Sequence, residues 1–301
     1  MKTQEQEQER EQKKIKRLSL LDNIYNTYLS RNANKNELTQ YYKLTTNKTD
    51  IRKIVKNILD TEEYKTNIFL PKDSYNSVIP LNVYVTWHTT NLPPKMKENY
   101  DNLKRENLQF KYYLYDDKHC REFIKNNFDN SVVNAFDKLV PGAYKADLWR
   151  YCVLYINGGI YIDVKYKCTN GFKLIALTEK EHWTLDRCGQ KIYNALMVCL
   201  PKNEILLSAI NQIVKNVNNK FYGDCSLSPT GPGLLSNYFS EEEKLNFELK
   251  HKTNEGRNYY KYILYNGKTI FKVYKHYKNE QNKFQKTTHY GHLWHEKKIY
   301  N

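Results

Sequence analysis

Apolar residues follow two different spacings along the chain. Before residue 70 they recur every three or four positions, most clearly over 51–59, where Thr49 or Asp50 can cap a helix. Beyond residue 80, short runs of β-branched and aromatic residues alternate with segments of helical spacing. We therefore predict a helical N-terminal region over 18–70 and an α/β domain over 79–301.

An alternating series of strands and helices makes up the predicted α/β domain. Strands are expected over 81–87, 110–115, 160–163, 182–185, 195–199, 259–265 and 268–274, the last two forming a hairpin. Helices are expected over 93–107, 118–127, 131–139, 145–157 and 204–217, and from the loop at 228–233 to Tyr238. This alternation predicts a mainly parallel, Rossmann-like sheet with helices on both faces, which binds ligands at the carboxyl ends of its strands.

The composition indicates a folded, basic protein. Its 301 residues include 48 Lys and Arg against 33 Asp and Glu, a net charge of +15, and 40% are hydrophobic, which suffices for a substantial core. Residues 1–17 form a charged tail, either disordered or a solvated helix, without a signal-peptide pattern, and no apolar run reaches the roughly 18 residues of a membrane span. The six cysteines form no Cys-x-x-Cys pair, as expected of free buried thiols in a reducing compartment. We expect a soluble cytoplasmic protein with no membrane anchor.

The concentration of positive charge near the C-terminus leaves a nucleic-acid-binding protein as an alternative. Residues 249–301 hold 12 Lys and Arg against 3 Asp and Glu, interleaved with Tyr, a composition typical of surfaces that follow a phosphate backbone and stack on bases. A solvated basic hairpin and tail explains the same composition. Because no helix-turn-helix, zinc-finger or RNP pattern accompanies the charge, we do not expect nucleic acid as the partner.

The segment 143–165 carries the clearest chemical pattern. Asp147 and Arg150 are three positions apart on a predicted helix, so they share one face. On the following strand, the period of two places three polar residues on one side: Tyr161, Asp163 and Lys165. Singly, these residues are explained by a helix ion pair, worth about 0.2–0.5 kcal/mol when exposed, and by a strand-end turn. Together they predict a carboxylate at the carboxyl end of a central strand, held by a cation, a metal or a ligand.

This segment resembles a glycosyltransferase family. Asp-x-x-Arg on a helix followed by Gly-Gly-x-Tyr-x-Asp on a strand is similar to the sugar-binding region with the DXD motif of family 32, a pattern shared by the glucosylating clostridial toxins. Further likenesses follow in the same order along the chain: Val83–Trp87, Asn91–Pro93, Thr230–Pro232 and His289–Trp294. The resemblance covers roughly 79–294 and implies a GT-A fold that transfers a sugar from a nucleotide donor with retention at the anomeric carbon.

The resemblance also implies roles for individual residues. Trp87 would stack on the nucleotide base, Asp147 and Arg150 would bind ribose, sugar or diphosphate, and Tyr161 would bond a phosphate. Asp163 would hold the donor and a metal-bound pyrophosphate. Asn194 and Trp294 occupy positions where relatives contact the donor. A turn amide explains Asn194 equally well, whereas the family-like His-x-x-His-x-Trp segment favours a site role for Trp294 over plain core packing.

One position departs from the family pattern. Lys165 stands where the family has the second Asp of DXD, and an ammonium cannot ligate Mn2+ or Mg2+. Three explanations compete: Lys165 supplies part of the metal's charge; other groups complete a metal site with Asp163, namely His292, Asp186 or Asp224; or activity is lost. We favour a working transferase with weakened or altered metal dependence, because Asp147, Arg150, Tyr161 and Asp163 are all present.

The sequence thus predicts a retaining glycosyltransferase with Asp163, Asp147, Arg150 and Lys165 in catalysis. A UDP-sugar is favoured as donor and a GDP-sugar is the alternative, whereas the acceptor, a glycan, protein or small molecule, is not encoded in any motif. An inactive protein that binds nucleotide sugars is the second interpretation, and it depends on Lys165.

Overall fold

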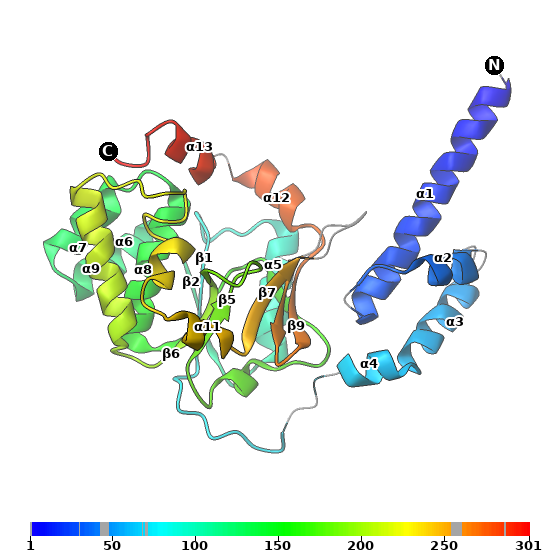
Figure 1. Cartoon of the computed structure of the whole chain (residues 1–301), viewed down its shortest axis with the longest axis horizontal. Coiled ribbons are helices and arrows are strands. Elements are labelled where there is room, and N and C mark those ends of the chain that lie inside the picture. Colours follow the sequence, from blue (N-terminus) through cyan, green and yellow to red (C-terminus); the bar gives the residue numbers. More distant parts are fainter. Residues whose placement is uncertain are drawn as a thin grey trace.

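The N-terminal helices pack on one another around a small core of their own. The computed structural model describes residues 2–29, 31–42, 48–67, 69, 72–253, 261–285 and 287–301. Its first helices are α1 (Lys2–Leu29), α2 (Lys35–Tyr41), α3 (Lys48–Leu59) and α4 (Glu62–Asn67), with Leu21, Ile54 and Ile58 fully or almost fully buried between them. The expected boundary at residue 17 therefore falls inside one continuous helix. In Figure 1 these helices stand beside the α/β body, to which residues 72–81 lead.

The α/β body is built on one sheet of nine strands. In chain order they are β1 (Asn82–Thr86), β2 (Lys111–Tyr115), β3 (Gly159–Ile162), β4 (Tyr166–Cys168), β5 (His182–Leu185), β6 (Ile192–Cys199), β7 (Leu249–Thr253), β8 (Lys261–Tyr265) and β9 (Lys268–Val273). Their order across the sheet is β2-β1-β3-β6-β5-β7-β8-β9-β4. Only β2-β1-β3 and β5-β7 pair in parallel, and the other neighbours are antiparallel. The α/β class is confirmed, but the sheet is mixed and not mainly parallel as predicted, because β6 runs antiparallel to both β3 and β5, and β8, β9 and β4 also pair in the antiparallel sense.

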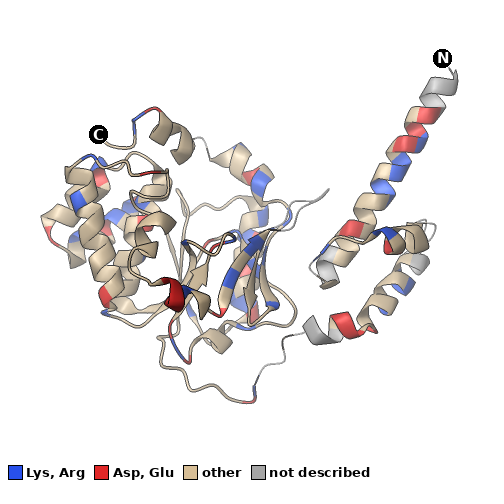
Figure 2. Cartoon of the chain, in the orientation of Figure 1, with Lys and Arg blue, Asp and Glu red and all other residues tan. Residues whose placement is uncertain are grey.

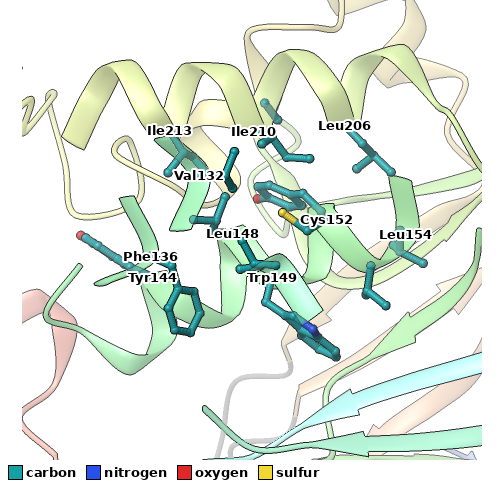
Figure 3. Close-up of a cluster of buried hydrophobic side chains, with 14 of the residues drawn as sticks. Val132, Phe136, Tyr144, Leu148, Trp149, Cys152, Leu154, Leu206, Ile210 and Ile213 are labelled. Atoms are coloured by element: carbon teal, nitrogen blue, oxygen red, sulfur yellow. The ribbon is translucent and has the colours of Figure 1, made fainter. Parts of the chain in front are cut away.

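Helices cover both faces of the sheet, as expected. The helices of the body are α5 (Pro94–Glu106), α6 (Asp117–Asn127), α7 (Asn130–Lys138), α8 (Gly142–Asn157), α9 (Glu204–Asn218), α10 (Pro232–Ser236), α11 (Glu241–Leu245), α12 (Tyr277–Phe284) and α13 (Tyr290–His295). Successive residues of β3 show the two faces: Ile160 packs in the core on the α5 side, and Tyr161 in the core formed with α6 to α9. Figure 3 shows the second core, where Leu148 and Cys152 of α8 lie toward Ile210 and Ile213 of α9, whereas Trp149 points away from α9.

Side chains that cap helix starts explain why several helices begin close to their predicted positions. Asp116 accepts a hydrogen bond from the backbone N–H of His119 at the start of α6, and Asn203 does the same for Ile205 and Leu206 at the start of α9. The sequence did not predict β4, β7, α11, α12 or α13. The cysteines are unpaired as expected, but only Cys120, Cys152 and Cys199 are buried, whereas Cys188 is exposed. In the described part of the chain, no helix combines the length and apolar character that crossing a membrane requires.

A short turn joins distant parts of the sheet. Residues 163–165 connect β3, third in the strand order, with β4, which is last, so the two parts of the sheet must approach each other there. Asn99 of α5 donates from Nδ2 to the carbonyl oxygens of Val164 (3.0 Å) and Tyr166 (2.9 Å). The backbone N–H of Tyr274, just after β9, donates to the Lys165 carbonyl at 3.0 Å. The turn that carries Asp163 is thus anchored from both sides.

Candidate active site

The α8–β3 connection depends on two glycines. Gly158 and Gly159 have φ angles of +61° and +109°, and a Cβ on either would meet a backbone atom of Pro201 or Asn82 at 2.7 Å. This tight turn brings β3 back beside α8. As a result Tyr161 of β3 lies beneath Arg150 of α8, whose guanidinium carbon is 4.3 Å from the centre of the tyrosine ring.

Asp163 is the centre of a cluster of polar side chains. Its Oδ1 accepts a hydrogen bond from the Tyr161 hydroxyl at 2.8 Å and lies 3.5 Å from Arg150 Nη1. Its Oδ2 lies 2.5 Å from Lys165 Nζ, which donates to it. The predicted grouping of Tyr161, Asp163 and Lys165 is therefore present. Its cause differs from the prediction, because β3 ends at Ile162 and Lys165 reaches Asp163 through a turn, not through strand alternation.

Asp147 and Arg150 form a second, more deeply buried group. Arg150 Nη1 donates to the backbone carbonyl of Asn194 at 2.7 Å, and Arg150 Nη2 lies 3.4 Å from Asp147 Oδ1. Asn194 Nδ2 donates to the same Asp147 oxygen at 2.9 Å. The three residues are only 6–8% exposed, so each polar atom needs such a partner.

The Thr-Gly-Pro segment completes the bonding of Asp147. The Thr230 hydroxyl donates to Asp147 Oδ2 at 2.8 Å, and the Thr230 carbonyl accepts from the Tyr151 hydroxyl at 2.9 Å. A Cβ at Gly231 would lie 3.0 Å from Asp147 Oδ2, so glycine permits this close approach. Tyr151 in turn accepts a hydrogen bond from Asn194 at 2.8 Å. Sequence analysis singled out Thr230 only by resemblance, and the structure supplies the physical reason.

Two adjacent cavities open onto these residues. The first, of about 300 Å³, is lined by Asp147, Lys165 and Asn194, and we call it the Asp147 cavity. The second, of about 160 Å³, is lined by Trp87 and Tyr161, and we call it the Trp87 cavity. Three residues line both, Ala143, Arg150 and Asp163. The cavities are therefore contiguous and meet at the Arg150–Asp163 pair.

The two carboxylates have opposite electrostatic surroundings. Burial raises the pKa of Asp147 above its ordinary value, although the charge of Arg150 opposes this shift. Burial also acts to raise the pKa of Asp163, but the charges of Lys165 and Arg150 outweigh it and the pKa is lowered. Asp163 consequently remains ionised and paired with its lysine at neutral pH.

The donor atoms near Asp163 do not match those that a divalent metal needs. Both Asp163 oxygens already face cationic or hydroxyl donors, and the neighbouring position is a lysine. Across the residues that the structure describes, no group of three or more His, Cys, Asp or Glu side chains is arranged to hold a metal ion. Asp186 lines the Asp147 cavity, but its Oδ1 is occupied by the backbone N–H groups of Gln190 and Lys191. These residues do not fit Mn2+ or Mg2+.

Three residues considered from sequence lie away from this centre. Trp294 donates its indole N–H to the carbonyl of Tyr222 at 2.7 Å and packs on the α8–α9 core, so it lines neither the Asp147 cavity nor the Trp87 cavity. His292 and Asp224 are exposed and line neither cavity either. Packing therefore explains Trp294, and the pairing of His292 with Asp163 as metal ligands has no support in the geometry.

Other residues in the Asp147 cavity were not anticipated. Arg187, Tyr193 and His251 all line it. The rings of Tyr193 and His251 stack with centroids 4.0 Å apart and planes inclined by 11°. They come from β6 and β7, elements far apart in sequence, and no local motif marks them.

Comparison with known proteins finds a family model that matches the part of the chain around this centre. Residues 93–181, which include Asp147, Arg150 and Asp163, match the family model described as a glycosyltransferase sugar-binding region containing DXD motif. Over these residues the chain is similar to the glycosyltransferase sugar-binding region. Within that region, the helix α8, the glycine turn and β3 are the elements that supply the candidate site.

Several glycosyltransferases resemble the chain around this sugar-binding region. An uncharacterized glycosyltransferase of Acanthamoeba polyphaga mimivirus is 36% identical over 77 residues, 26% of this chain and 31% of its own length. Inositol phosphoceramide mannosyltransferase 3 of Schizosaccharomyces pombe is 26% identical over 191 residues, 60% of this chain and 53% of its own length. The matches thus span about a third to a half of these relatives. Among solved structures, a PaToxG glycosyltransferase aligns over 55% of this chain and 69% of its own, with 16% identity and a TM-score of 0.44.

Proposed function

We propose that the protein transfers a sugar from a nucleotide sugar to a hydroxyl acceptor, with retention of configuration, as a GT-A-type enzyme. The observation that carries this proposal is the pair of contiguous cavities that meet at Arg150 and Asp163. A nucleotide sugar has two recognition ends joined by a diphosphate. The Trp87 cavity suits the nucleotide, the Asp147 cavity suits the sugar, and the diphosphate would lie between them.

Each end of the proposed donor finds suitable chemistry. Trp87 offers an aromatic surface for the base, and its indole N–H is buried without a partner among the described residues, so a ligand acceptor would satisfy it. On the other side, Asp147 and Asn194 offer a carboxylate and an amide for sugar hydroxyls. These groups are fixed by hydrogen bonds to Thr230 and Tyr151, so little reorganisation is needed when a sugar binds.

The proposed reaction breaks one bond and forms one. The bond from the anomeric carbon to the β-phosphate oxygen breaks, and its electron pair stays on that oxygen, which leaves with the nucleoside diphosphate. The acceptor oxygen forms a bond to the same carbon from the same face, and its proton passes to the departing phosphate oxygen. Fixed positive groups near that oxygen stabilise its developing charge.

We propose that this transfer does not require a divalent metal. In a site with two carboxylates a cation would be needed to keep the diphosphate from being repelled. Here Lys165 pairs with Asp163 at 2.5 Å, so the carboxylate is neutralised by a covalently attached cation. The opposite interpretation, an inactive protein that binds nucleotide sugars, shares this geometry and differs only in turnover.

Donor and location belong to the proposal as well. We favour a UDP-sugar over a GDP-sugar, and mannose is the first sugar to test because curated relatives are named mannosyltransferases. The six unpaired cysteines support a reducing, cytoplasmic location.

Donor hydrolysis tests the function without knowledge of the acceptor. Purified protein is incubated with a panel of UDP- and GDP-sugars, and release of nucleoside diphosphate is followed. We expect release from one donor class and a loss of at least about 100-fold in Asp147→Asn. Asp137→Asn, on the surface and paired with Arg121, is the matched control and should keep full activity. Tight binding of UDP or GDP without release would favour the inactive protein, and release unchanged in Asp147→Asn would reject the proposed site.

A further inference from the structure

The charges inside the candidate site cancel one another. Asp147 and Asp163 contribute two negative charges, while Arg150 and Lys165 contribute two positive charges, and their side chains lie within 2.5–3.5 Å of one another in pairs. A nucleoside diphosphate brings additional negative charge into this neutral group. Given the proposed function, and since no group of three or more His, Cys, Asp or Glu among the described residues could hold a metal, we look for the counter-charge in other residues of the cavity.

Arg187 is in a position to supply positive charge for the diphosphate. This residue follows β5 in the turn that leads to β6, is exposed, and lines the Asp147 cavity together with Asp163 and Lys165. Within the described part of the chain, no carboxylate lies within ion-pair distance of its guanidinium. The adjacent Asp186 carboxylate accepts hydrogen bonds from the backbone of its own loop and forms no ion pair with Arg187.

A second cation, on another element, lies near the Asp147 cavity. Lys278 of α12 lines a neighbouring cavity of about 210 Å³, which shares Ala143 and Tyr290 with the Asp147 cavity. Its Nζ donates to Gln281 Oε1 at 3.2 Å and has no ion-pair partner among the described residues. Lys278 therefore adds positive charge beside the Asp147 cavity.

The surrounding groups respond to this positive potential. Burial, together with the charges of Lys165, Lys261 and Arg187, lowers the pKa of His251 to about 3 against the opposing effect of Asp186. Burial also lowers the pKa of Lys261, and the positive charges of Lys165, Lys278 and Arg187 contribute smaller shifts in the same direction. These cations are thus close enough to repel one another, and a bound anion would relieve the repulsion. Figure 2 shows further Lys and Arg residues along β7 to β9.

We propose that Arg187, assisted by Lys278, binds the diphosphate of the nucleotide donor and supplies the positive charge that a divalent metal supplies in enzymes with an intact DXD motif. A guanidinium suits this role because its planar fork donates two hydrogen bonds to neighbouring phosphate oxygens and cannot lose its charge. The inference deepens the proposed function, since it names the residue that holds the leaving group of the same reaction.

Binding measurements with matched ligands test this role. Affinities for UDP, uridine and inorganic pyrophosphate are measured by calorimetry in the presence of EDTA for the wild type and four variants: Arg187→Gln, Arg187→Lys, Lys278→Gln and Lys283→Gln. Lys283 lies on α12 like Lys278 but lines neither of the two neighbouring cavities, so it controls for the loss of one charge.

We expect Arg187→Gln to lower the affinity for UDP and for pyrophosphate about tenfold or more, because the charge-assisted hydrogen bonds are lost. The affinity for uridine, which has no phosphate, should stay unchanged. Arg187→Lys should recover part of the loss, Lys278→Gln should lose less, and Lys283→Gln should behave as the wild type. GDP and guanosine replace UDP and uridine if the donor panel selects a GDP-sugar.

The outcomes separate the two proposals. If Arg187→Gln binds UDP and pyrophosphate as the wild type does, or loses affinity for uridine to the same extent, the role of Arg187 is rejected. The proposed sugar transfer is then still tested by donor hydrolysis. If the wild type binds pyrophosphate through Arg187 but releases no nucleotide from any donor, the anion site is supported and the proposed transfer fails.

Discussion

The two ends of the nine-stranded sheet differ in their polar residues: those at one end are buried and bonded to one another, and those at the other are mostly basic. At the β2-β1-β3-β6 end, covered by α5 on one face and by α6 to α9 on the other, Asp147, Asn194 and Thr230 are buried and bonded to one another. At the β7-β8-β9-β4 end the strands are antiparallel, and the C-terminal segment 249–301 carries 12 Lys and Arg against 3 Asp and Glu.

The turn at 163–165 lies where these two ends join. One end provides a nearly neutral network that can recognise sugar hydroxyls, and the other, with the β5–β6 turn, provides positive charge that can receive a diphosphate. Recognition of the sugar and the positive charge for the diphosphate therefore come from different parts of the fold. Changes at each end should therefore have separable effects.

Asp163→Asn should have the largest effect, because Asp163 belongs to both ends. The change removes the carboxylate partner of Lys165, which leaves this cation without a counter-charge in a largely buried site, and Arg150 keeps only Asp147 beside it. Unfolding free energy should fall on the order of 3 kcal/mol, and donor hydrolysis should fall at least about 100-fold. Chemical denaturation and nucleotide release measure the two effects. Wild-type levels of both would contradict the central place of Asp163.

Thr230→Val should affect only the neutral end. Valine has nearly the shape of threonine but cannot donate to Asp147 Oδ2, so the buried carboxylate loses one of its hydrogen bonds. The lost bond is worth about 1–3 kcal/mol, and the KM for the donor should rise roughly tenfold. Thr230→Ser, which keeps the hydroxyl, serves as the control. Binding of pyrophosphate should remain unchanged, and a parallel loss of pyrophosphate binding would show that the two ends are not separable.

His251 gives the smallest and most local prediction, at the basic end. Its folded pKa of about 3 lies below its ordinary value of 6.5, so the unfolded chain takes up a proton first as the pH falls. Stability should therefore decrease below about pH 6.5, by roughly 1 kcal/mol per pH unit from this residue. His251→Phe keeps a ring against Tyr193 and should reduce that slope in denaturation curves between pH 7 and pH 4. Burial also lowers the pKa of His182, to about 4, so this residue should account for pH dependence of stability that remains in His251→Phe. Identical slopes would rule out a buried neutral His251.

The sequence predicted the first end of the sheet far better than the second. Strand β1, helices α6 to α9 and the segment from Asp147 to Lys165 were recognisable because their spacing is regular and their partners are close along the chain. Strands β4 and β7 were not, since Tyr166–Cys168 is very short and Leu249–Thr253 alternates lysine with a single buried histidine. Such strands are defined by partners that the local pattern does not reveal.

The candidate site shows the same division. Asp147, Arg150, Tyr161 and Asp163 were predicted to lie together and do so, whereas Arg187 and His251 join them only through the tertiary fold. Trp294 is the converse case. Its position near a family-like histidine segment suggested a donor contact, but its indole N–H is taken by the Tyr222 carbonyl.

The central claim is that fixed cations, not a bound metal, supply the charge for the donor diphosphate, and metal dependence tests it most directly. Donor hydrolysis is measured in EDTA and in Mn2+ for the wild type and for Lys165→Asp, which restores the second carboxylate of the motif. We predict that the wild type is equally active in both conditions, and that Lys165→Asp is inactive in EDTA and regains activity with Mn2+. A wild type that loses activity in EDTA and recovers it with Mn2+ would contradict the account.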